Sequence, residues 1–161
     1  MSTSYHLERT QFIPRPVAEV FAFFCDAANL EALTPPWLHF KILTPRPILI
    51  AAGTLIDYRL QMFGIPFYWQ TRIEEFEPGV RFVDSQVRGP YARWWHVHEF
   101  RETSGGTEMI DRVDYRMPWG PLGTLTHAVL TRHQLRTIFA YRQQRIEELF
   151  SAVASEPASP T

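Results

Sequence analysis

The sequence contains a single cysteine, Cys25, among 161 residues. A lone cysteine excludes an intrachain disulfide framework and a zinc site built from several cysteines. The chain also lacks an excess of either charge, because it has 16 basic and 17 acidic residues and a net charge of -1. Such a chain has no long-range field that would attract a polyanion, so we expect no nucleic-acid partner.

Long apolar runs are also missing from the sequence. The segment ILIAA at 48–52 is far shorter than the roughly 18 residues that a membrane-spanning helix needs. The first residues, MSTSYHLERT, lack the charged and then apolar pattern of a secretory signal peptide. We therefore expect no membrane span and a cytoplasmic location.

The residues that are present divide into strand-like and helix-like segments. Residues 4–13 alternate in polarity, and the following segment turns helical, with apolar residues three and four apart, before Pro35 and Pro36 end it. Glycine and proline then separate a series of strand-like segments, which predicts an antiparallel meander. These segments are LHFKIL, GTLIDYRLQM, FYWQTRIEEF, VRFVDSQVR, YARWWHVHEF and TEMIDRVDYRM.

A long helix is predicted from Pro121 to about Phe150, because apolar residues recur there at a spacing of three or four. This stripe should lie against the sheet. The rest of the chain, 153–161, is small, polar and proline-bearing, and we expect it to be disordered after a single domain spanning 1–152. The stripe consists of Leu125, Val129, Leu135, Ile138, Phe139, Arg142, Ile146 and Leu149.

The order of these elements over residues 4–150 resembles the START and birch-pollen-allergen-like superfamily, also called SRPBCC. The segments TPPWLHFKI, GTLIDYRL, GIPFYWQTRI, RFVDSQVRGPY, HVHEF, GGTEMIDRVDY and PWGPLG are similar to an uncharacterised ligand-binding family within it. The resemblance implies an α+β helix-grip fold: a curved seven-stranded antiparallel sheet around a long C-terminal helix, two short helices between strands 1 and 2, and a cavity. Members of the superfamily carry lipids, hormones or hydrophobic metabolites, or act as polyketide cyclases and aromatases.

Strand parity predicts which side chains line that cavity, because alternate residues of a strand share one face. The face that is more apolar in every strand also carries polar groups, which cost several kcal/mol if they are buried without partners. With Arg142 from the helix, the predicted ligand-binding residues are Tyr58, Trp69, Thr71, Phe82, Asp84, Gln86, Trp94, His96, His98, Asp111, Val113, Tyr115 and Arg142.

Hairpin register brings the polar groups of this face together. Turns centred on Pro90 and between Thr103 and Ser104 would place Asp84 and Asp111 on either side of His96. A shift of two residues would bring His98 beside Asp111 instead. We predict a row of Asp84, His96 and Asp111 across three strands.

Three interpretations of this polar row remain open. It can be a structural network whose members satisfy one another, or it can anchor the polar group of an otherwise apolar ligand. It can also be catalytic, with His96, His98, Asp111 and Asp84 as candidates. The pair of histidines with an adjacent carboxylate could ligate zinc or iron, but the two carboxylates opposite the pair are only inferred from the register, so no metal and no cofactor is predicted.

The function predicted from the sequence is binding or carriage of a small hydrophobic or amphipathic molecule by a monomer or weak dimer. The first alternative is an enzyme of the cyclase or dehydratase type, with His96 or His98 as general acid or base. The second alternative is a non-catalytic interaction module whose own side chains fill the cavity.

Overall fold

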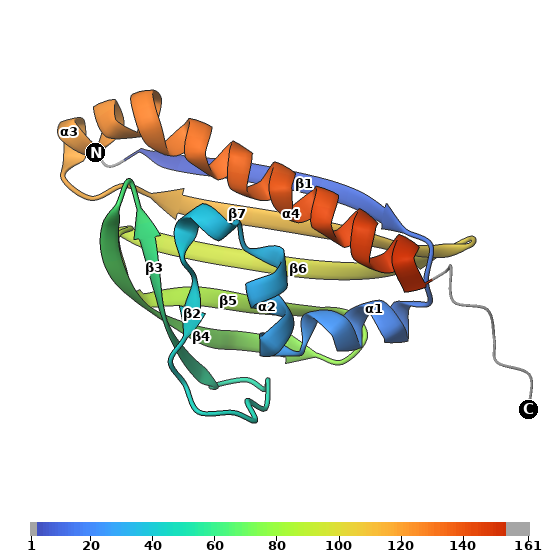
Figure 1. Ribbon diagram of the computed structural model, residues 1–161. Helices are drawn as coiled ribbons and strands as arrows, with labels where there is room; N and C mark the ends of the chain where they lie inside the picture. The colour runs from blue at the N-terminus through green and yellow to red at the C-terminus, as the bar shows by residue number, and fades with distance from the viewer. Residues whose placement is uncertain (1–2, 154–161) are drawn as a thin grey trace, which may run out of the picture.

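A curved antiparallel sheet and one long helix across its face make up the fold in our computed structural model, which describes residues 3–153 (Figure 1). The helix-grip fold expected from the sequence is confirmed. The strands are β1 (Ser4–Ile13), β2 (Lys41–Ile42), β3 (Leu55–Met62), β4 (Ile65–Glu77), β5 (Arg81–Arg88), β6 (Arg93–Thr103) and β7 (Gly106–Arg116). The helical segments are α1 (Val17–Phe24), α2 (Ala27–Leu33), η1 (Pro36–Leu38), α3 (Gly120–Thr126), η2 (His127–Thr131) and α4 (Arg132–Val153).

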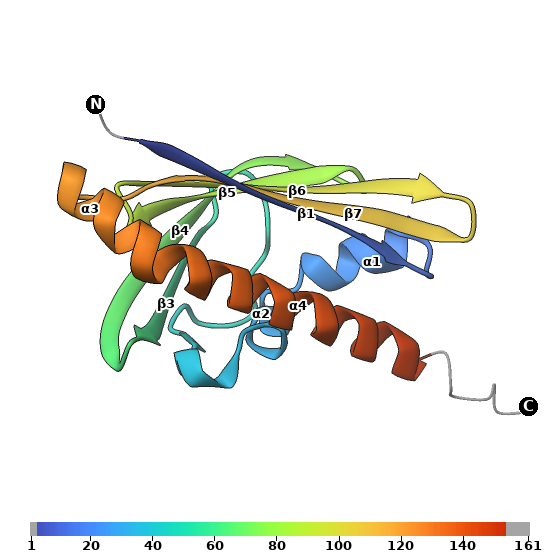
Figure 2. The same ribbon diagram turned by 90° about the horizontal axis from the view of Figure 1, so that it is seen from above.

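The seven strands are ordered β1-β7-β6-β5-β4-β3-β2, and every neighbouring pair is antiparallel. Strands β2 to β7 therefore form the predicted meander, and β1 closes onto β7. The two short helices α1 and α2 come between β1 and β2, as expected. Figure 2 shows α4 running across one face of the sheet, with α1 and α2 on the same side.

Local sequence explains where the second short helix begins. The side chain of Asp26 accepts a hydrogen bond of 2.9 Å from the backbone N–H of Ala28, which caps α2. Such a cap satisfies a backbone donor that has no partner within the helix, and it stabilises the helix by about 1 kcal/mol. The cap fixes the start of α2, which is separated from α1 by two residues, and α2 lies on the same side of the sheet as α4 (Figure 2).

The buried apolar residues form two clusters between the sheet and the helices. One contains Tyr58, Trp69, Trp94 and Phe139 and lies toward β3 and the middle of α4. The other gathers around Phe82, where α1 and the end of α4 meet the sheet. Burial of aromatic side chains provides much of the driving force for a domain of this size.

The C-terminal helical run begins close to the predicted residue but presents a different face in its first half. Leu125 and Val129 were expected to face the sheet, yet they are 61% and 64% exposed, and His127 and Thr131 are buried instead. The reason is the π-helical segment η2 at His127–Thr131. A π turn contains more residues than an α turn. The residues before it are therefore rotated about the helix axis and no longer lie in line with the apolar stripe that begins at Leu135.

The register of the β6–β7 hairpin differs by two residues from the prediction. His98 lies opposite Asp111, and His96 lies opposite Val113, whereas Asp84 lies opposite His96 as predicted. Thr103 pairs with Gly106, so Ser104 and Gly105 form the turn, and Gly105 has a φ of 84°. Two-residue hairpin turns favour positive φ, which glycine adopts without steric cost.

The described chain ends at Val153, the last residue of α4. Apart from Val153, which is helical, the disordered tail predicted for 153–161 lies outside the described residues. Between residues 3 and 153, no helix is both long enough and apolar enough to cross a bilayer.

Candidate ligand-binding site

A cavity of about 210 Å³ lies between the sheet, α2 and α4. Its walls are mainly aromatic and aliphatic, and most of the residues predicted to bind a ligand lie along it. The predicted residues that do line it are Tyr58, Trp69, Thr71, Phe82, Asp84, Trp94, His96, His98 and Arg142. The strand parity that the sequence indicated therefore places the intended face toward the cavity.

Four predicted residues do not line this cavity. The Gln86 side chain donates a 2.7 Å hydrogen bond to the backbone oxygen of Tyr91 and so spans the β5–β6 connection. Val113 is fully buried within the core, and Tyr115 hydrogen-bonds His127 at 2.8 Å. Asp111 lies behind the two imidazoles, in contact with them from the side away from the cavity lining.

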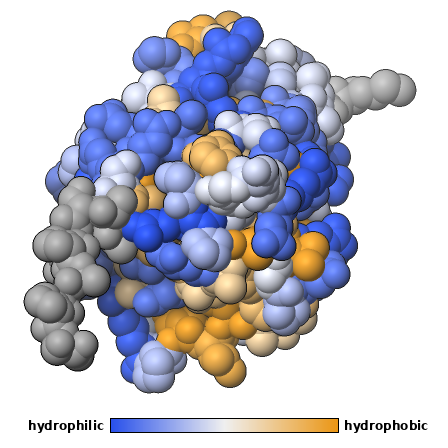
Figure 3. Space-filling view, turned by 90° about the vertical axis from the view of Figure 1, so that its right-hand side faces the viewer, coloured by the Kyte–Doolittle hydropathy of each residue, from blue (hydrophilic) through white to orange (hydrophobic). Residues whose placement is uncertain are grey.

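The wall formed by α2 was missed in the sequence. Ala27, Leu30 and Leu33 line the cavity, and their spacing of three is an amphipathic signal that could have been read. Ile50, from the loop between β2 and β3, lines it too, and its neighbour Leu49 is 85% exposed. This loop is the lowest segment in Figure 1. Figure 3 views the molecule from the right-hand side of Figure 1 and shows apolar surface at the bottom of that side.

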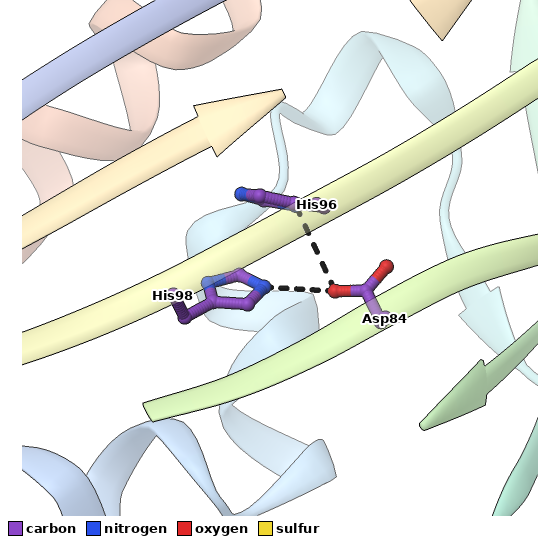
Figure 4. A group of neighbouring side chains, drawn as sticks. All are labelled: Asp84, His96 and His98. Carbon is purple, nitrogen blue, oxygen red and sulfur yellow. Dashed lines mark hydrogen bonds and ion pairs between the residues drawn. The ribbon is translucent and has the colours of Figure 1, made fainter. Parts of the chain in front are cut away.

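Three polar side chains meet at the wall of the cavity. His98 Nε2 lies 2.8 Å from Asp84 Oδ2, and His96 Nδ1 lies 3.7 Å from the same oxygen. Figure 4 shows both rings approaching this one oxygen from neighbouring positions on β6, with Asp84 on β5. The side chains of His96 and His98 are 8% and 5% exposed, so both rings are already shielded from bulk water.

A second layer lies behind the imidazoles. His96 Nε2 hydrogen-bonds Asp111 Oδ1 at 3.0 Å, and His98 Nδ1 lies 2.9 Å from the same oxygen without hydrogen-bond geometry. Arg142 Nε on α4 lies 3.3 Å from the other oxygen of Asp111. Arg142, predicted as a ligand-binding residue, therefore pairs with Asp111 while it also lines the cavity.

The surroundings of these groups move their pKa values in different directions. For His98, burial alone would lower the pKa, but the two carboxylates outweigh it and raise the pKa. For His96, burial and the charge of His98 lower the pKa despite the carboxylates. Burial would raise the pKa of Asp111, yet Arg142 and the imidazoles hold it well below its usual range.

Most other polar atoms at the cavity have partners within the wall. The Tyr58 hydroxyl hydrogen-bonds the Thr71 hydroxyl, and Trp69 Nε1 donates to the same oxygen at 3.0 Å. Burial, followed by the charge of Asp84, raises the pKa of Tyr58, so its hydroxyl stays neutral. The cluster of Asp84, His96 and His98, with Arg142 beside it, is thus the polar wall of an apolar cavity.

A sheet wrapped around a C-terminal helix, with an apolar cavity between them, defines a helix-grip protein of the SRPBCC superfamily. The chain belongs to the family described as "Polyketide cyclase / dehydrase and lipid transport", whose model matches residues 13–140. No curated protein matches the chain.

Solved structures share the fold at low sequence identity. A protein of unknown function, SA2116 from Staphylococcus aureus, has a TM-score of 0.72 at 11% identity and covers 96% of this chain and 98% of its own. Ara h 8.0201 has a TM-score of 0.60 at 15% identity, and the match covers 91% of this chain and 99% of that one. A nucleoside-diphosphate sugar epimerase from Corynebacterium glutamicum matches at 27% identity and a TM-score of 0.59, over 88% of this chain but only 28% of that one.

Proposed function

We propose that this chain binds a small, mostly apolar molecule in the cavity, with a polar group of that molecule against Asp84, His96 and His98. The observation that carries the proposal is the cavity of about 210 Å³, which has aromatic walls and this one polar wall. Small-molecule sites commonly combine an apolar lining with a few placed polar groups. The family description, which includes lipid transport, supports an apolar ligand.

The size of the cavity limits the ligand. A dry cavity of about 150 Å³ holds benzene, so a cavity of about 210 Å³ suits a molecule of one or two rings. The flat faces of Trp69 and Trp94 favour an aromatic ring system. A two-ring alcohol, 2-naphthol, is therefore a suitable probe.

Isothermal titration calorimetry with 2-naphthol tests the proposal. Ile138→Trp places a larger side chain in the cavity wall, whereas Ala140→Trp places the same side chain on the exposed face of α4. We expect one site per wild-type chain, binding weakened about tenfold or more by Ile138→Trp, and little change in Ala140→Trp. Absence of binding, or equal binding to all three proteins, would contradict the proposal.

The polar wall has a separate test. Naphthalene has the rings of 2-naphthol without the hydroxyl, and one hydrogen bond contributes about 0.5–1.5 kcal/mol. We expect wild-type protein to bind 2-naphthol more tightly than naphthalene, by up to about tenfold. Equal affinities would mean that the polar cluster does not contact the ligand.

The other expectations from the sequence remain predictions. If the chain is a cyclase or dehydratase, turnover should be lost in His96→Ala or His98→Ala proteins that still fold and bind 2-naphthol. If it is an interaction module with a filled interior, no small molecule should stabilise it. We also predict a cytoplasmic monomer or weak dimer without a nucleic-acid partner.

A further inference from the structure

Three potential metal-ligating atoms converge at the polar wall of the cavity. His96 Nδ1, His98 Nε2 and a carboxylate oxygen of Asp84 all lie within 4.8 Å of one another, and Figure 4 shows the rings directed at that carboxylate. We propose that Asp84, His96 and His98 bind one divalent transition-metal ion. The sequence predicts Asp84 beside His96, and the pairing of β5 with β6 places it there.

The hydrogen bonding of His96 leaves a lone pair directed at this locus. Asp111 is a carboxylate and can only accept, so His96 Nε2 must donate in their 3.0 Å hydrogen bond. A neutral His96 then carries its lone pair on Nδ1, which lies 3.7 Å from the negatively charged Asp84 oxygen. A lone pair and a carboxylate oxygen that face each other are the two kinds of atom that a cation binds together. By the same argument His98 Nε2 donates to Asp84 in their 2.8 Å hydrogen bond, so a bound metal ion displaces that proton and leaves a neutral ring with its N–H on Nδ1, which lies 2.9 Å from Asp111.

Asp111 has the position of an orienting partner. It contacts the nitrogen of each imidazole that faces away from Asp84, at 3.0 Å for His96 and 2.9 Å for His98. Histidines that ligate metals usually have their second nitrogen held by a carboxylate or carbonyl, which fixes the ring. Arg142 in turn holds Asp111, so we assign Asp111 a positioning role and not a ligand role.

The charge and exposure of the site favour a transition metal with an open coordination position. Among the residues described between 3 and 153, the ion-pair partners of Asp84 are the two imidazoles only, so no arginine or lysine competes for its carboxylate. Imidazole with carboxylate suits zinc or iron(II) better than magnesium or calcium. Because all three ligands line the cavity, a fourth position would face the cavity.

Calorimetric titration of EDTA-treated, dialysed protein with zinc chloride tests this proposal. We expect one zinc ion per wild-type chain and a rise in Tm of about 5–10 °C at a free zinc concentration about 100 times Kd. Asp84→Asn and His98→Gln should each weaken binding by at least about 100-fold, and Asp111→Asn by about 10- to 100-fold.

The exposed pair of His6 and Asp114, 2.9 Å apart on β1 and β7, provides matched controls. His6→Gln and Asp114→Asn should leave zinc affinity unchanged. Histidine-ring NMR signals of the wild type test the same point without a variant, because zinc should shift the signals of His96 and His98 and not that of His6. No zinc binding, binding that survives both Asp84→Asn and His98→Gln, or a shift at His6 alone would overturn the proposal.

The metal proposal does not rest on ligand binding in the cavity. The 2-naphthol titration is done in EDTA, and the zinc titration is done without 2-naphthol. Either result can therefore be negative while the other is positive.

Discussion

His96 and His98 stand two residues apart on β6, yet their surroundings move their pKa values in opposite directions. His98 makes close contacts with both carboxylates, whereas His96 has its one hydrogen bond to Asp111 and rings of Trp94 and Phe139 beside it. Alternation along a strand predicts that both histidines share a face. It does not predict which carboxylate lies closest to each histidine. That depends on the register of the β6–β7 hairpin, which differs by two residues from the predicted one.

Cys25 gives a prediction at the scale of a single residue. Burial raises the pKa of its thiol to about 11, and only the thiolate reacts as a nucleophile. At pH 8 the folded protein should react with dithiobis(nitrobenzoate) roughly 100-fold more slowly than the protein unfolded in denaturant. Since Cys25 is the only cysteine, the signal belongs to it, and equal rates would contradict the account.

His127 gives a second prediction, on pH dependence. Burial, with a smaller contribution from Arg132, lowers the pKa of this histidine below its usual value. As pH falls from 7 to 5 the unfolded chain takes up the proton first, so the free energy of unfolding falls. The loss attributable to His127 is at most about 1.4 kcal/mol per pH unit.

Urea unfolding at pH 7 and pH 5 measures this loss as a difference between two proteins. His127→Gln keeps a polar side chain that can accept from Tyr115 but does not titrate. Wild-type protein should lose more free energy of unfolding between the two pH values than His127→Gln. Equal losses would show that the pKa of His127 is not lowered.

At the scale of elements, the helices and strands follow from the apolar pattern, but the π-helical segment does not. The predicted stripe is correct from Leu135 onward, where Leu135, Phe139 and Ile146 are buried. Before that residue, η2 rotates the helix, and the buried residues become His127 and Thr131. The spacing of apolar residues does not mark the position of the π turn. Within this turn His127 stacks on Tyr5 and hydrogen-bonds Tyr115, two contacts with strands that are distant in sequence.

Two leucines of the C-terminal helical run test this rotation. Leu135→Ala removes a buried side chain, 4% exposed, and should lower the free energy of unfolding by about 2–5 kcal/mol. Leu125→Ala removes one that is 61% exposed and should change it by no more than about 0.5 kcal/mol. Chemical denaturation of both variants measures the difference, and a large loss in Leu125→Ala would show that this residue packs against the sheet.

At the scale of the whole molecule, the order of elements predicts the topology, because consecutive strands joined by short turns pair as hairpins. The sheet wall of the cavity follows from strand parity. The wall formed by α2 does not, since its position depends on contacts with α4 and the sheet that are distant in sequence. Those contacts place Leu30 and Ile138 on the cavity and leave space between them and Trp69.

The most direct test of a ligand cavity inside this fold is an NMR titration of the tryptophan indole N–H signals with 2-naphthol. Trp69 and Trp94 line the cavity, whereas Trp119 is 73% exposed and lies outside it. Saturating 2-naphthol should shift the indole signals of Trp69 and Trp94 and leave that of Trp119 unchanged. A shift at Trp119 alone, or no shift at Trp69 and Trp94 at saturation, would contradict the account.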